Sequence, residues 1–127
     1  MMRMLGLFAL LVAISGCGNS DKPKLVVLSG TVTMDSKPLT AGSINFHPDS
    51  SNAYVKDKPS SLLQTDGSFI AKTFPFGEGI SPGKYKVTLA PELAARIKRP
   101  KYGKSDETPW SIDVPESGIT DLKLEVK

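Results

Sequence analysis

The feature that most constrains the fold is an alternation of apolar and polar residues with a period of two, which recurs in short segments along most of the chain. The segments 43–47, 84–89, 110–114 and 121–126 each place apolar side chains at every second position. This period matches the side-chain repeat of a β-strand, whereas an α-helix repeats every 3.6 residues. Such a strand buries one face and exposes the other, as the strands of antiparallel sheets do. The sequence therefore predicts a protein built mainly of strands.

Turn signals separate these segments. Asp66-Gly67 is a strong hairpin signal, because both residue types tolerate positive φ. Asp35-Ser36-Lys37-Pro38 and Pro82-Gly83 mark two more tight connections, and the ten prolines and eleven glycines lie mostly between apolar segments. With a further strand at 25–33, the 127 residues predict a single all-β domain, a seven-stranded antiparallel β-sandwich.

One segment has a helical pattern instead. At 91–98, Pro91 occupies a first helical position, Glu92 follows it in the first turn, and Leu93 and Ile97 are spaced by one turn. A short helix is therefore expected at 91–98.

The first sixteen residues have the pattern of a targeting segment. Arg3 precedes an apolar run at 5–13, which is too short to cross a bilayer, because a spanning helix needs roughly 20 residues. The stretch Ile14-Ser15-Gly16-Cys17 then places the only cysteine after one aliphatic and two small residues. It resembles the lipobox of bacterial lipoproteins, in which the cysteine thiol receives a diacylglyceryl group and the peptide is cut before the cysteine. More than one acyl chain gives a firm membrane anchor.

This resemblance implies a signal peptide at 1–16, a lipid on Cys17, a polar tether at 17–24 and a folded domain at 25–127. Localisation at the cell envelope follows. Gly18 stands where aspartate would retain enterobacterial lipoproteins at the inner membrane, which favours the outer membrane, facing the periplasm or the cell surface. Two other readings stay open: ordinary secretion after an A-x-A-like site at 13–15, and an uncleaved segment in which Cys17 is a plain residue.

Three stretches carry a second resemblance: SGTVTMDSKPLTAGSINFHPD at 29–49, QTDGSFIAKT at 64–73 and SPGKYKVTL at 81–89. They are similar to the motifs of bacterial carboxypeptidase regulatory-like domains, which have a transthyretin-like (prealbumin-like) sandwich. With the lipobox and the segment 101–114, the chain resembles small bacterial lipoproteins over roughly residues 25–127. Ser36 stands where the family prefers glycine, so the type of that turn is left open. The motifs consist of turn glycines and core aromatics, and so imply a fold but no chemistry.

The strongest candidate binding segment is a basic cluster that follows the expected helix. Its members are Arg96, Lys98, Arg99, Lys101 and Lys104. Such a cluster can contact phosphates, anionic polysaccharide or lipid headgroups, although Asp106 and Glu107 soften its field and a solvated loop is the plain alternative. The net charge of +3 is too small to indicate nucleic acid. Tyr102 and Trp110 could offer an aromatic face to a sugar, but Trp110 alternates with Ile112, which favours a core position.

Catalysis and metal binding find little support in the residues. His47 is the only histidine, and one histidine cannot form a zinc peptidase motif. Neighbouring residues at one strand end rarely reach the geometry of a Ser-His-Asp triad. An exposed histidine at the end of a strand is therefore expected. The loop 48–59 carries Asp49, Asn52 and Asp57 without the spacing of a calcium loop. No catalytic residue, cofactor or metal is therefore expected.

The leading hypothesis is a lipid-anchored envelope sandwich with a non-catalytic binding or spacer role, and an envelope polysaccharide or protein as its partner. The alternative is a carbohydrate- or polyanion-binding module that uses 96–104.

Overall fold

The computed structural model describes residues 22–127. The strands, in chain order, are β1 (Leu28–Met34), β2 (Lys37–Pro38), β3 (Ser43–Pro48), β4 (Ser60–Leu62), β5 (Ser68–Ile70), β6 (Lys72–Thr73), β7 (Gly77–Glu78), β8 (Gly83–Leu89), β9 (Ser111–Val114) and β10 (Ile119–Val126). Between β8 and β9 lie the helix α1 (Pro91–Arg96) and a 3-10 helix (Pro100–Gly103).

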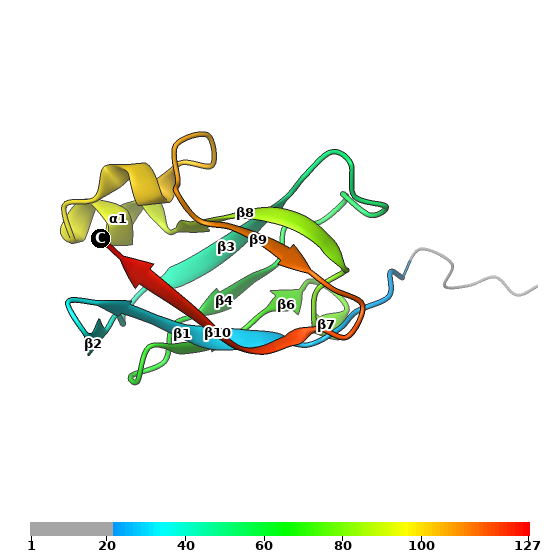
Figure 1. The fold of residues 1–127 in the computed structure, drawn as a ribbon, viewed down its shortest axis with the longest axis horizontal. Coiled ribbons are helices and arrows are strands. Elements are labelled where there is room, and N and C mark those ends of the chain that lie inside the picture. The colour runs from blue at the N-terminus through cyan, green and yellow to red at the C-terminus, as the bar shows by residue number, and fades with distance from the viewer. Residues whose placement is uncertain (1–21) are drawn as a thin grey trace, which may run out of the picture.

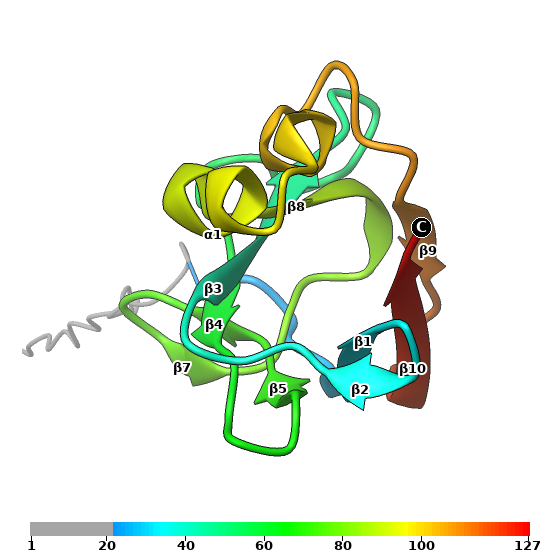
Figure 2. The same cartoon turned by 90° about the vertical axis from the view of Figure 1, so that its left-hand side faces the viewer.

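The strands form two sheets that face each other (Figures 1 and 2). One sheet has the order β10-β1-β2, with β5 also paired to β1, and the other has the order β7-β6-β4-β3-β8-β9. Apolar side chains from both sheets meet between them, and Leu28, Phe46, Phe69 and Val87 have at most 1% of their surface exposed. The predicted all-β sandwich is thus confirmed, with the core on the faces that the alternation marks.

Two details differ from the sequence-based expectation. The structure has ten strands in place of seven, because several are pieces of two or three residues that carry no detectable alternation. In addition, β1 and β10 run parallel, whereas every other strand pair is antiparallel. Period-two alternation identifies a strand and its buried face, but it carries no information about which strand lies beside it or in which direction.

The pairing of β1 with β10 depends on Gly30. The register passes from Ser29↔Thr120 to Gly30↔Leu122, so Asp121 is left out in a bulge. A Cβ atom on Gly30 would lie 2.1 Å from the carbonyl oxygen of Leu122. Only a residue without a side chain lets the two backbones approach this closely.

The turn at Asp35-Ser36 is a two-residue hairpin between β1 and β2, since Met34 pairs with Lys37. Both turn residues have positive φ, 55° and 66°. This is the type I′ geometry, which suits the twist of a hairpin and is cheapest for glycine or asparagine. The presence of Ser36 therefore does not change the hairpin turn into an ordinary type I or II turn.

A tyrosine fixes the start of β8. The Tyr85 hydroxyl donates a hydrogen bond of 2.6 Å to the carbonyl of Ser81, four residues upstream, across the Pro82-Gly83 turn. The same arrangement, known as a tyrosine corner, recurs in Greek-key sandwiches. The side chain is buried, and burial raises the pKa of Tyr85 to about 12.

The expected helix is present but ends at Arg96. Pro91 occupies its first turn, and Leu93 and Ala94 are buried against the sandwich. Lys98 has φ 62°, its N–H donates to Ala95, and the N–H of Arg99 donates to Ala94. These bonds form a Schellman motif, in which the left-handed residue is usually glycine. The motif ends the helix two residues before the predicted boundary.

Candidate functional site

The basic cluster lies at the end of α1 and on the 3-10 helix, but its five members have different roles. The guanidinium of Arg96 donates hydrogen bonds to the carbonyls of Thr40 (3.0 Å) and Ala41 (3.2 Å). Nε of Arg99 donates to the carbonyl of Lys127 at 2.9 Å. Both arginines thus join segments that are distant in sequence, and much of their donor capacity serves the fold.

The three lysines of the cluster are exposed: Lys98, Lys101 and Lys104. Nζ of Lys101 lies 6.0 Å from the centre of the Tyr102 ring, at the outer limit of a cation–π contact. Nζ of Lys104 lies 4.0 Å from a carboxylate oxygen of Glu107, a surface pair that contributes little to stability. The charge that this loop can offer to an anion therefore comes mainly from these lysines.

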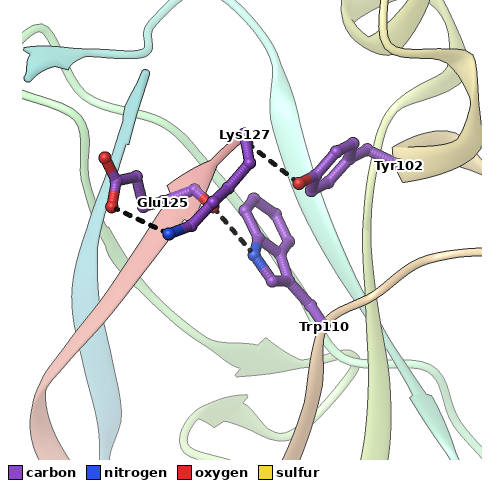
Figure 3. Close-up of polar contacts among 4 residues, drawn as sticks. All are labelled: Tyr102, Trp110, Glu125 and Lys127. Atoms are coloured by element: carbon purple, nitrogen blue, oxygen red, sulfur yellow. Dashed lines mark hydrogen bonds and ion pairs between the residues drawn. The ribbon is translucent and has the colours of Figure 1, made fainter. Parts of the chain in front are cut away.

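The loop stands on a rigid aromatic support (Figure 3). The rings of Tyr102 and Trp110 meet edge to face at 4.8 Å, and both are buried. The Tyr102 hydroxyl accepts a hydrogen bond of 3.0 Å from the N–H of Lys127, while Nε1 of Trp110 donates to the carbonyl of Glu125 at 3.3 Å. The core position expected for Trp110 is confirmed. Because Tyr102 is buried as well, neither ring is free to stack on a sugar.

A concave surface lies away from every site residue that the sequence predicts. An apolar groove of about 710 Å³ runs over β4, β5, β6 and β7. It is lined by three large apolar side chains, Leu62, Ile70 and Phe74, which are 71%, 44% and 85% exposed. Soluble domains rarely gather exposed apolar side chains in this way unless something binds there.

Two of these side chains, Leu62 of β4 and Ile70 of β5, point outward from different sheets because of the same alternation that builds the core, and Phe74 lies in the turn after β6. Leu63, Phe69 and Ala71 point inward and are buried, so Leu62, Ile70 and their even-numbered neighbours point outward. Polar residues also line the groove: Ser60, Gln64, Ser68 and Lys72. The sequence carries one signal of this surface: 62–74 is apolar at both odd and even positions, so some of its apolar residues must lie outside the core, although the pattern does not identify which.

The groove opens where the chain passes from one sheet to the other. The sequence predicts that the segments on either side of Asp66-Gly67 pair as a hairpin, and this is confirmed only in part. Ser60 of β4 pairs with Lys72 of β6, and the N–H of Gln64 donates to the carbonyl of Ser68, but β5 pairs with β1 in the other sheet. The Ser61 hydroxyl bridges the separating strands, because it donates to the carbonyl of Leu62 (2.9 Å) and accepts from the N–H of Ile70 (3.3 Å). The turn itself is present, with Gly67 at φ 79°.

The histidine is more enclosed than predicted. His47 is half-buried, and its Nε2 lies 2.8 Å from the Thr88 hydroxyl. This contact explains why Thr88 is buried although the alternation placed it on the wet face. Burial, and then the charge of Lys58, lower the pKa of His47 below its ordinary value.

The oxygen ligands of the 48–59 loop are used within the fold. The Asp49 carboxylate accepts bonds from the N–H and the hydroxyl of Ser51, and these bonds lower the pKa of Asp49. The Asn52 side chain bonds the backbone N–H and carbonyl of Lys84 at 2.8 Å each. Tyr54 donates to Asp57. Within residues 22–127, no three His, Cys, Asp or Glu side chains gather to hold a metal ion.

Cys17, the predicted lipidation site, and the predicted signal peptide at 1–16 lie outside the described residues. None of the helices in the described part of the chain is long and apolar enough to cross a membrane.

No family model, curated protein or solved structure matches this chain. The two candidate surfaces, the basic loop at 96–104 and the apolar groove, must therefore be interpreted from their own geometry.

Proposed function

We propose that this chain is a lipid-anchored lipoprotein of the bacterial cell envelope, whose transthyretin-like β-sandwich has a non-catalytic binding role. The observation that carries the binding role is the apolar groove, because a pure spacer gains nothing from three large apolar side chains exposed around one groove. The lipobox motif at 14–17 supports the anchor, and Gly18 favours the outer membrane, facing the periplasm or the cell surface.

The placement of the chain ends supports an orientation for the anchored domain. The described chain begins at the end of the sandwich opposite α1, whereas α1 and the C-terminus lie at the other end (Figure 1). Eight residues, 17–24, join the lipidation site to the domain, and at about 3.5 Å per residue they reach at most about 28 Å. The end that contains residue 24 then faces the membrane, and the basic loop points away from the lipid that holds the protein.

The site chemistry supports a role without catalysis. His47 contacts the Thr88 hydroxyl and is influenced by the charge of Lys58, and neither of these two partners is a carboxylate that could orient the imidazole as in a catalytic triad. A lowered histidine pKa at this position has burial as its main cause.

A second candidate function rests on the basic loop. Lys98, Lys101 and Lys104 are exposed on a segment held by the Tyr102 and Trp110 contacts, so an anion that binds there need not first order the loop. In the proposed orientation this loop faces an envelope polyanion in front of the membrane.

The anchor is tested by expressing the full chain and Cys17→Ser in a bacterium, followed by fractionation and mass spectrometry of the mature amino terminus. We expect the parent chain in the membrane fraction with an acylated Cys17, and the variant outside it. A soluble parent chain that begins at an unmodified Gly16 or Cys17 would show ordinary secretion and contradict the anchor.

The second candidate is tested by neutralising Lys98, Lys101 and Lys104 together with glutamine. A matched control neutralises Lys37, Lys86 and Lys123, which changes the net charge equally elsewhere on the surface. If the loop binds polyanions, only the first variant loses retention on an anionic column, and the loss is larger at low salt because exposed charges are screened within roughly 8 Å at physiological ionic strength. Equal losses of retention for both variants would show that the net charge of the protein, and not the 96–104 loop, determines binding to the column.

A further inference from the structure

We infer that the apolar groove binds an acidic carbohydrate chain, and that it does so through side chains alone. The inference rests on the proposed function, since it names the class of ligand that the sandwich holds. The carbohydrate site inferred here is the groove over β4, β5, β6 and β7, whereas the alternative drawn from the sequence used the 96–104 loop.

The apolar part of the groove suits the flat face of a sugar ring. A pyranose presents C–H groups on its faces and hydroxyl groups around its edge, so it needs an apolar surface bordered by hydrogen-bonding groups. Phe74 is the most exposed aromatic side chain of the described residues, and its ring can stack on such a face. Leu62 and Ile70 extend the apolar surface along the groove.

The border of the groove supplies the polar half of the site. Ser60 and Ser68 carry hydroxyl groups that can both donate and accept, and the Gln64 amide has two donors and an acceptor. A purely apolar occupant such as an acyl chain would leave these groups against hydrocarbon, which costs free energy for each one that loses its partner. The mixed lining therefore favours a ligand that is itself apolar on its face and polar at its edge.

A peptide strand added beside β5 is disfavoured because the main-chain groups of that strand are largely occupied. The N–H of Ser68 donates to the Asp66 carboxylate (3.0 Å), and its carbonyl accepts from the N–H of Gln64 (2.9 Å). The N–H of Ile70 donates to the Ser61 hydroxyl (3.3 Å). Peptides that extend a sheet take their affinity from free main-chain groups, and β5 has few left to give.

The groove carries a small positive charge, which favours an acidic carbohydrate over a neutral one. The charged residues that line it are Lys58, Lys72 and Glu78, which sum to +1 because Glu78, the register partner of Lys72, offsets one lysine. Lysines beside an apolar surface attract carboxylate or phosphate groups carried by a ligand. The volume of about 710 Å³ lies within the range of small-ligand sites, roughly 300–1,000 Å³, and so accommodates a short run of sugar units.

The test uses the full chain, purified from the cell fraction that contains it and held in lipid nanodiscs if that fraction is the membrane. Calorimetry measures binding of three probes: a uronic-acid hexasaccharide, a neutral glucose hexasaccharide and hexaglutamate. We expect the uronic-acid probe to bind best. Phe74→Ser should weaken that binding roughly tenfold or more, because the aromatic platform is lost. Val55→Ser, which removes another exposed apolar side chain outside the groove, should leave it unchanged.

Lys72→Gln measures the contribution of charge to binding separately from that of the Phe74 ring. It should weaken binding of the uronic-acid probe, more at low salt than at high salt, and bring its affinity close to that of the neutral probe. Circular dichroism at the start of each titration verifies that the variants are folded.

Several outcomes would overturn the inference. They are absence of binding by the uronic-acid probe, binding that survives Phe74→Ser, and equal or tighter binding of hexaglutamate, which would indicate an acidic polypeptide ligand. If binding instead disappears in the Lys98, Lys101 and Lys104 variant, the envelope-binding function stands and the groove is the wrong site. If no probe binds but Cys17 is acylated, the anchor stands and the carbohydrate inference fails.

Discussion

Gly30→Ala tests whether the close approach of β1 and β10 holds the sandwich together. Gly30 is not among the residues with positive φ, so alanine introduces no backbone strain of its own. Its methyl group would nevertheless stand 2.1 Å from the Leu122 carbonyl oxygen and 2.9 Å from the Leu122 Cβ. Carbon–oxygen contacts between strands are normally about 3.3 Å or longer, so the strands must separate by about 1 Å.

The magnitude follows from two opposing effects. Alanine restricts the unfolded chain, which stabilises the fold by about 0.4–1 kcal/mol, whereas overpacking costs about 1–3 kcal/mol. The atom that must yield is a backbone oxygen in a seven-pair ladder, so we take the upper end of the cost, which leaves a net destabilisation of about 2 kcal/mol. For a domain of this size that lowers Tm by on the order of 8 °C.

Thermal and urea unfolding, followed by the near-ultraviolet signal of Trp110, measure the effect. Thr31→Ala is the matched control, because it changes the adjacent residue without altering the main-chain ladder, and should cost less than about 1 kcal/mol. A Gly30→Ala protein as stable as the parent would refute the reasoning, because it would show that the added methyl group causes no steric clash large enough to lower the free energy of unfolding.

Three further predictions concern stability. Ser36→Gly and Lys98→Gly should each raise the free energy of unfolding by a few tenths of a kcal/mol to about 1 kcal/mol, because both residues have left-handed φ, which glycine adopts without strain; a lower urea midpoint for either variant would contradict this. The pKa of His47 is lower in the folded chain than its ordinary value of about 6.5, so the unfolded chain binds more protons, and stability should fall as the pH drops from about 6.5 through the folded pKa. His47→Gln should remove this pH dependence of stability between pH 7.5 and 5. An unchanged pH dependence would show that another group causes it. Tyr85→Phe should lower the free energy of unfolding by about 0.5–1.5 kcal/mol through loss of the bond to Ser81, and an unchanged urea midpoint would show that the bond contributes nothing.

The alternation was sufficient to predict the sandwich and most of its core, because burial of one strand face is a local property of the sequence. Ile44, Phe46, Val87 and Leu124 are buried as predicted. The partners of the strands could not be predicted in this way. The parallel contact of β1 with β10 joins residues about ninety positions apart, and no local pattern encodes it.

The candidate sites, too, were predictable only as far as local sequence patterns determine them. The sequence located the basic cluster, but it could not reveal that Arg96 and Arg99 bond main-chain carbonyls, since those carbonyls belong to distant segments. The groove was missed for a different reason. Leu62 is an apolar residue on an outward position of a short strand and Phe74 lies in the turn after β6, and without the structure an apolar residue is assigned to the core by default.

The parallel ladder between β1 and β10 has a consequence for how the protein folds. Leu28 pairs with Ile119 and Met34 with Val126, so the first strand of the sandwich cannot gain its partner on this side until the last strand is present. Contacts of such high sequence separation slow folding, because the intervening chain must be closed into a loop before they form. A chain that leaves the ribosome or crosses a membrane amino terminus first therefore keeps β1 without this partner until its final residues emerge. During that interval β1 presents an unpaired edge, the kind of surface that chaperones and misfolded neighbours bind.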